Sequence, residues 1–392
     1  MESLFDKRKK TLPFGSYEEY MEYLFTCVNE GMNRYLTGLK QVYSLGEGGY
    51  KNVLYPDLEI AHDVCLEKLG RFQSEETAPM EEEHEALDSG EKDDLMDLEG
   101  LFSEFVMETT QPEVETEDIA ELMDYINARA KLAKEAGVSL PFYEICEKLN
   151  YENFTVFCLT CGILSSTQTD YAGVFQVINE NGSLPMPTIE SAAKLYYGSS
   201  FSITGAYGDM SVCLEQLLPV LNLHVQGNMP FSTVVSPDKR MIDFLFGRTP
   251  MKLDQDYVRF FQMLTDDKEL DPILANRGVL EAMEISYGEG VRIFSYYGDE
   301  GSGRKFFVKH FCKEHGMGAI SINCKKLFVY DFSFVEKALW AVTRECILTN
   351  SCCCLDDLSY REEEKDKFFG YMDLAFSKLT GHGLLVFAIS RE

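Results

Sequence analysis

Short apolar stretches alternate with helical stretches through the last hundred residues of this chain. Apolar strands are expected at residues 291–297, 319–323, 352–355 and 384–389. The helices expected between them span residues 304–315, 334–349 and 362–379. Because a strand that is followed by a helix returns to the same sheet by a right-handed crossover, this alternation predicts a parallel sheet. Residues 290–392 are therefore expected to form an α/β domain.

The chain upstream is predicted to be mainly helical, because its apolar residues recur at three- and four-residue steps. We expect a helical region at residues 1–74 and helical connectors at 100–141 and 251–289. Three short helices followed by β-rich stretches at 201–203 and 231–235 predict a winged-helix-like α+β domain over residues 142–250. Ser236 and Pro237 predict the start of a further helix, with serine as the N-cap and proline in the first turn.

An acidic segment interrupts this helical pattern at residues 75–99. It holds twelve aspartate and glutamate residues against a single basic residue, Lys92. A segment of this composition buries too little apolar area to offset the entropy that ordering costs. We expect a disordered acidic linker, and an acidic docking tail is the alternative.

The charge of the chain bears on its partners. It carries 65 acidic and 36 basic residues, a formal net charge of −29. Such a surface repels phosphates unless basic residues cluster, and the candidate recognition helix at 188–197 offers only Lys194. Nucleic acid and anionic membranes are therefore disfavoured, proteins are the expected partners, and no apolar run of membrane-spanning length is found.

The twelve cysteines follow no regular spacing, and three of them are consecutive at Cys352, Cys353 and Cys354. Free thiols of this kind are typical of the reducing cytoplasm, which is the expected location. Cys158 and Cys161 form a C-x-x-C pair, but no second pair or nearby histidine completes a zinc site. Buried packing is the preferred interpretation of that pair.

A glycine-rich loop joins the first expected strand of the α/β domain to its first helix. Gly298 and Gly303 follow the Walker A spacing of two glycines five apart, in which backbone N–H groups surround phosphates, and Gly301 and Ser302 lie between them. Arg304 stands where a lysine would reach the terminal phosphates. Lys305 stands where a hydroxyl group would bind magnesium. A nucleotide site is therefore predicted, and a plain structural turn is the alternative.

Two carboxylates, Asp356 and Asp357, follow the apolar strand at 352–355, in the position of a Walker B motif. Asp356 is the predicted magnesium ligand, acting through water. Asp357 is the predicted catalytic residue that orients the attacking water, and it is one methylene shorter than the usual glutamate.

With these two motifs, residues 290–392 resemble the front half of an AAA-type P-loop ATPase. The upstream region resembles the winged-helix-type module found with such cores in large bacterial AAA proteins. The resemblance implies ATP and Mg²⁺ as cofactors, assembly into homo- or hetero-oligomers, and a polar sensor at Ser390 near the terminal phosphate.

AAA cores continue into a fifth strand, an arginine finger and a helical lid, whereas this sequence ends at Glu392. We expect a truncated product or one part of a longer protein. The expected function is nucleotide-dependent assembly or remodelling, with hydrolysis weak or absent in this chain alone. The alternative is a non-enzymatic scaffold that retains a degenerate P-loop fold.

Overall fold

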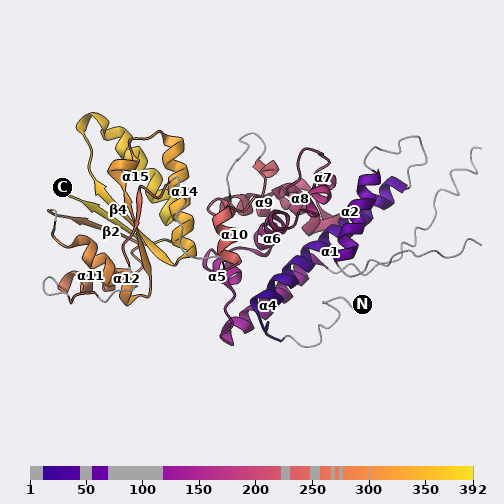
Figure 1. Cartoon of the computed structure of the whole chain (residues 1–392), viewed down its shortest axis with the longest axis horizontal. Helices are drawn as coiled ribbons and strands as arrows, with labels where there is room; N and C mark the ends of the chain where they lie inside the picture. Colours follow the sequence, from indigo (N-terminus) through magenta and orange to yellow (C-terminus); the bar gives the residue numbers. More distant parts are fainter. Residues whose placement is uncertain are drawn as a thin grey trace, which may run out of the picture.

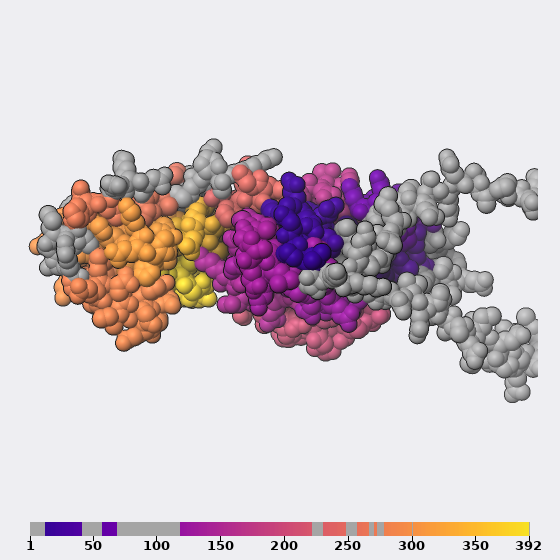
Figure 2. Space-filling view, turned by 90° about the horizontal axis from the view of Figure 1, so that it is seen from below, coloured from indigo at the N-terminus to yellow at the C-terminus, as the bar shows by residue number. Residues whose placement is uncertain are grey.

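The computed structural model describes residues 12–44, 55–68, 118–221, 230–247, 257–265, 270–272, 277–299 and 301–391. These residues form two parts, which lie side by side along the long axis of the molecule (Figures 1 and 2). We call residues 12–247 the helical half and residues 257–391 the sheet half. The acidic segment at 75–99 lies outside the described residues.

The helical half is built around α6 (Asn153–Thr167), of which eleven residues are buried. Helices α1, α4, α8 and α9 pack against it. The bounds of the remaining helices are α1 Tyr17–Ser44, α2 Tyr55–Lys68, α4 Ile119–Glu135, α5 Pro141–Lys148, α7 Tyr171–Ile178, α8 Ile189–Tyr197, η1 Gly198–Ser200, α9 Ile203–Leu217, η2 Pro230–Ser232 and α10 Lys239–Leu245. No helix in the described ranges is long and apolar enough to cross a membrane.

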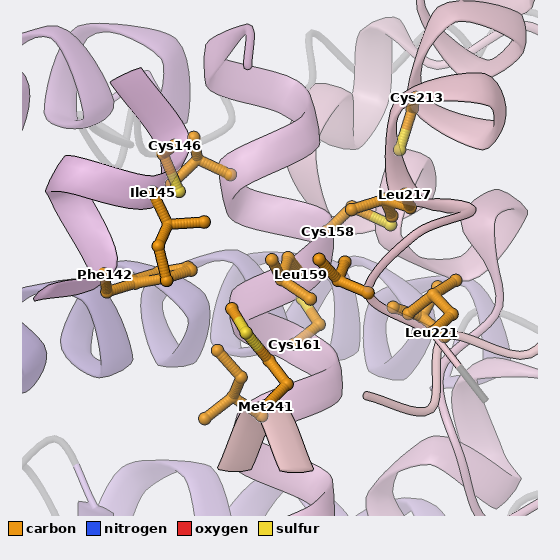
Figure 3. Packing of buried hydrophobic residues seen from close by; sticks show 14 of the residues in the cluster. Phe142, Ile145, Cys146, Cys158, Leu159, Cys161, Cys213, Leu217, Leu221 and Met241 are labelled. Atoms are coloured by element: carbon orange, nitrogen blue, oxygen red, sulfur yellow. The ribbon is translucent and has the colours of Figure 1, made fainter. Parts of the chain in front are cut away.

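Both cysteines of the C-x-x-C pair lie inside this helical core. Cys158 and Cys161 are fully buried on α6. Figure 3 shows them among apolar side chains such as Leu159, Leu217 and Met241. The pair packs as small hydrophobic residues, as the sequence predicted.

Three local predictions for residues 142–250 are wrong. Helix α9 begins at Ile203, where a strand had been expected, and Ser202 caps it by accepting a hydrogen bond from the Gly205 N–H. The stretch at 231–235 begins within η2 and contributes one isolated bridge, between Val234 and Thr188. Asp238, not Ser236, caps α10, because its carboxylate reaches the N–H group of the second helical residue. The described part of 142–250 therefore contains helices and two isolated β-bridges but no β-strand.

The sheet half contains a five-stranded sheet in the order β1-β3-β4-β5-β2. Its strands are β1 Phe261–Met263, β2 Ile293–Tyr297, β3 Gly318–Asn323, β4 Ser351–Leu358 and β5 Val386–Ser390. Its helices are α11 Arg277–Gly288, α12 Arg304–Glu314, α13 Cys324–Leu327, α14 Phe332–Leu348, η3 Glu362–Glu364 and α15 Lys365–Thr380. All neighbouring strands are parallel except β1, which is antiparallel to β3. The predicted parallel α/β domain is confirmed at this level.

The edge strand β1 was not predicted. The stretch at 251–289 was expected to be a helical connector, but Phe261–Met263 pairs with Ile320–Ile322 of β3, and only α11 is helical in its described part. Three residues are too few for a periodic pattern, so the neighbouring strand decides their conformation.

Successive residues of β4 enter different hydrophobic cores. Cys352 and Cys354 pack with Val308 and Phe311 of α12, whereas Cys353 and Leu355 belong to the core that also holds α13, α14 and α15. This follows from strand geometry, in which neighbouring side chains point to opposite faces. The sheet is therefore covered by helices on both faces (Figure 1).

Helix α14 joins the two halves. Twelve of its seventeen residues are buried, and they include the charged Arg344 and Glu345. Arg240 of α10 donates from Nε and Nη2 to the two oxygens of Glu345, both at 2.9 Å. Arg344 pairs with Asp238 at 3.3 Å. Two charge pairs therefore connect the start of α10 to the end of α14.

Breaking the Arg240–Glu345 pair should destabilise the protein, because the Glu345 side chain is only 3% exposed. We expect Arg240→Met to lower the free energy of unfolding by about 3–5 kcal/mol, since it leaves a buried carboxylate without its partner. Adding Glu345→Leu should recover most of this loss. Urea unfolding measures both effects.

The exposed pair between Lys365 and Glu362 provides the control. Lys365→Met should change the stability by less than about 1 kcal/mol. An Arg240→Met variant as stable as Lys365→Met would contradict a structural role for the buried pair.

Candidate functional site

A cavity of about 400 Å³ opens at the carboxyl edge of the parallel sheet. Strand β5 lies between β2 and β4, so the loop after β2 faces the acidic end of β4 across the end of β5. Open α/β sheets bind ligands outside the carboxyl ends of their strands. The cavity is lined by Gly301, Gly303, Arg304, Lys305, Phe306, Asn323, Asp356, Asp357, Ile389, Ser390 and Arg391.

The glycine loop reaches the cavity through its second half. Gly301 and Gly303 line it in left-handed conformations, with φ of 87° and 81°, which side chains other than glycine adopt only at a cost. Gly298 and Ser302 do not line the cavity. A Cβ atom on Gly298 would lie 3.3 Å from Ser302 Oγ, so these two residues shape the turn. Of the four predicted loop residues, two are therefore brought to the cavity.

The helix that follows the loop begins with an unusual charge pattern. Gly303 caps α12 without a side-chain hydrogen bond, and no acidic residue lies in the first turn. Arg304 and Lys305 occupy that turn instead. A helix N-terminus carries partial positive charge, so each cation there is unfavourable by about 0.3–1 kcal/mol. An anion bound in the cavity would remove this penalty and would accept hydrogen bonds from the first N–H groups of the helix.

Both cations already contact groups across the cavity. The Arg304 guanidinium donates from Nη1 to the carbonyl oxygen of Ser390 at the end of β5. The Lys305 ammonium forms an ion pair with Asp356 at the end of β4. The start of α12 is therefore tied to the ends of two strands.

Asp356 and Asp357 both line the cavity, although neighbours in a regular strand point to opposite faces. The pairing of β4 with β5 shifts register here, from Leu355 opposite Ala388 to Leu358 opposite Ser390. The two aspartates thus oppose the single residue between those partners, which makes a β-bulge. Asp357 takes φ of 56° within it. Bulges of this kind turn side chains toward sites at sheet edges.

The sequence did not single out Asn323, Phe306 or Arg391 as site residues. Asn323 ends β3 opposite Asp356, and its side-chain oxygen accepts a hydrogen bond from the Lys326 N–H at 2.9 Å. Asn323 could have been predicted, because it is a polar residue at the end of an apolar strand. Phe306 could not, because an apolar residue in the first turn of a helix is equally typical of a hydrophobic core.

Two thiols close to the site are chemically inert. Burial, and then the nearby carboxylate of Asp356, raise the pKa of Cys354 to about 12. Burial also raises the pKa of Cys324 well above its ordinary value, with Cys354 and Asp356 adding to the effect. Both groups therefore stay protonated at neutral pH and supply neither a nucleophile nor a thiolate ligand.

Apart from the carboxylate of Asp357, the oxygen atoms around the cavity do not fit a magnesium ion. Asp356 is paired with an ammonium group, the Asn323 amide oxygen and the Ser390 carbonyl oxygen accept hydrogen bonds, and Lys305 replaces the ligating hydroxyl. No group of three or more His, Cys, Asp or Glu side chains within the described ranges is arranged to hold a metal. The predicted role of Asp356 as a magnesium ligand therefore lacks support in the geometry.

The bulge at Asp357 generates a test of stability. Asparagine and aspartate tolerate the left-handed conformation, whereas a β-branched residue does not. We expect Asp357→Val to be less stable than Asp357→Asn by about 1–2 kcal/mol, and Asp357→Gly to be at least as stable as Asp357→Asn. Urea unfolding of the three variants provides the comparison, and equal stability of the valine and asparagine variants would contradict the bulge.

No protein-family model, curated protein or solved structure matches this chain. The resemblance to AAA-type ATPases therefore stays a prediction from the sequence. Within the described ranges, the chain has a mixed α/β fold with a mostly parallel five-stranded sheet and a polar cavity at its carboxyl edge.

Proposed function

We propose that this chain binds the phosphates of a nucleoside triphosphate, ATP, in the cavity at the carboxyl edge of its sheet. One observation carries the proposal. The start of α12, which has no side-chain cap and carries Arg304 and Lys305 in its first turn, opens into a cavity of about 400 Å³ at a sheet edge where ligands usually bind. Helix N-termini preceded by glycine loops bind phosphate groups through backbone N–H groups and the helix dipole.

The nucleotide is proposed to control an assembly more than to be consumed. Phosphoryl transfer depends on positioning, and the positioning groups here differ from those of an active ATPase. Arg304 contacts the Ser390 carbonyl and Lys305 contacts Asp356. Among the described residues that line the cavity, Asp357 is left to orient a water, and it is one methylene shorter than the usual glutamate. Hydrolysis by this chain alone is therefore proposed to be weak or absent. The proposed AAA-type role is nucleotide-dependent association with proteins or with further copies of the chain.

A scaffold without bound nucleotide is the second candidate, and exposed apolar side chains favour it. They come from the segment after α13, the start of α14, the segment after β4 and the start of α15. The Phe332 ring stacks on the buried Tyr371, and the Tyr360 ring contacts the partly buried Phe368. Large exposed apolar patches mark interaction surfaces. The residues are Val329, Phe332, Tyr360 and Phe369.

Titration calorimetry with a slowly hydrolysed ATP analogue tests the first candidate. We expect heat of binding at millimolar nucleotide, and a loss of affinity of about tenfold in Gly301→Ala, because the added Cβ forces the loop out of its left-handed conformation. No heat from the parent protein at millimolar nucleotide would favour the scaffold.

Gly290→Ala is the matched control. Gly290 also has a left-handed conformation, with φ of 95°, and a Cβ atom there also meets no atom within 4 Å, yet the residue does not line the cavity. It should bind the analogue as the parent does. Equal losses of affinity in both glycine variants would place the ligand elsewhere.

A further inference from the structure

We propose that the Lys305 ammonium takes the place of a divalent cation in this cavity, so that the chain binds the metal-free form of a nucleoside polyphosphate. The inference rests on the proposed nucleotide binding and names the form of the ligand. It follows from the Lys305–Asp356 ion pair and from the atoms that surround it.

The ion pair faces the cavity. Lys305 lies in the first turn of α12, and its ammonium reaches across the end of β5 to the carboxylate of Asp356. The Lys305 side chain is 39% exposed, and the Asp356 side chain is 19% exposed. An ammonium has three N–H donors, and one of them suffices for Asp356. The others are available to phosphate oxygens, so Lys305 can link the ligand to Asp356 as a metal ion does elsewhere.

Three of the groups that could supply oxygen ligands to a metal ion are already engaged by protein donors, and Asp357 is the other carboxylate at the cavity. Asp356 holds the ammonium, Asn323 Oδ1 accepts from the Lys326 N–H, and the Ser390 carbonyl accepts from Arg304. A metal ion at Asp356 would have to displace Lys305 and would then lie next to its charge. Magnesium also requires near-ideal octahedral geometry and loses its water reluctantly, so the protein gains little in exchange.

The charge of the ligand favours the same form. A metal-free polyphosphate carries more negative charge than its magnesium complex, and the first turn of α12 presents two cations at the positive end of the helix dipole. The chelated form would bring additional positive charge to this end. The cavity therefore discriminates between the two forms of one nucleotide.

The test is titration calorimetry of a slowly hydrolysed ATP analogue in EDTA and in excess Mg²⁺. We expect the parent protein to bind in EDTA and to bind about fivefold more weakly with Mg²⁺, the effect of repulsion between unit charges a few ångströms apart in water. Lys305→Thr, which frees Asp356 and supplies a hydroxyl group, should bind more tightly with Mg²⁺ than in EDTA.

Because Mg²⁺ also chelates the free analogue, a matched variant is needed. Lys309→Thr removes the same charge from the same helix at a residue that does not line the cavity. It should show the same sign of the magnesium effect as the parent. A reversed sign in Lys305→Thr alone assigns the effect to Lys305.

Direct metal binding gives a second readout. The relaxation of water protons by Mn²⁺, with the ATP analogue present, should show no ternary complex with the parent protein and a clear one with Lys305→Thr. This measurement on the parent also decides the matter if Lys305→Thr fails to fold.

The outcomes separate the two proposals. Binding by the parent only when Mg²⁺ is present, or a Mn²⁺ ternary complex with the parent, overturns the role of Lys305 but leaves nucleotide binding intact. The absence of binding in both EDTA and Mg²⁺ overturns nucleotide binding itself, and this inference with it.

Discussion

Both faces of the parallel sheet must be covered, and the rest of the structure depends on how this is achieved. Helices α11 and α12 cover one face, and α13, α14 and α15 cover the other. The hydrophobic core on the second face, which includes α14, continues into the helical half. Most residues of α14 are therefore buried. Its two buried charged residues, Glu345 and Arg344, form ion pairs with Arg240 and Asp238. The sheet and the helical half share one core through this helix.

The candidate site depends on the same helix. Helix α14 ends at Leu348 and β4 begins at Ser351, so one short stretch leads from the Arg240–Glu345 contact to the aspartates at the cavity. The position of Asp356 is fixed from two directions, by pairing of β4 with β3 and by the ion pair with Lys305. The cavity aspartates and the contact with the helical half therefore lie on one continuous segment of the chain.

The sequence was informative where periodicity or spacing is strong. Parallel strands β2 to β5, with α12, α14 and α15 between them, were predicted within a few residues, because alternating apolar runs leave few other folds. The cavity residues Gly301, Gly303, Arg304, Lys305, Asp356, Asp357 and Ser390 were predicted as well.

What the sequence could not reveal depends on partners distant along the chain. The pairing of β1 with β3, the bulge that turns Asp357 toward the cavity and the Lys305–Asp356 ion pair all need tertiary contacts. The twelve cysteines have a practical consequence of the same kind, since all are buried and are shared between the helical half and both faces of the sheet. A thiol reagent can reach them only when the structure opens. The chain thus carries its own set of labelling probes, whose rates of modification report separately on the opening of each part.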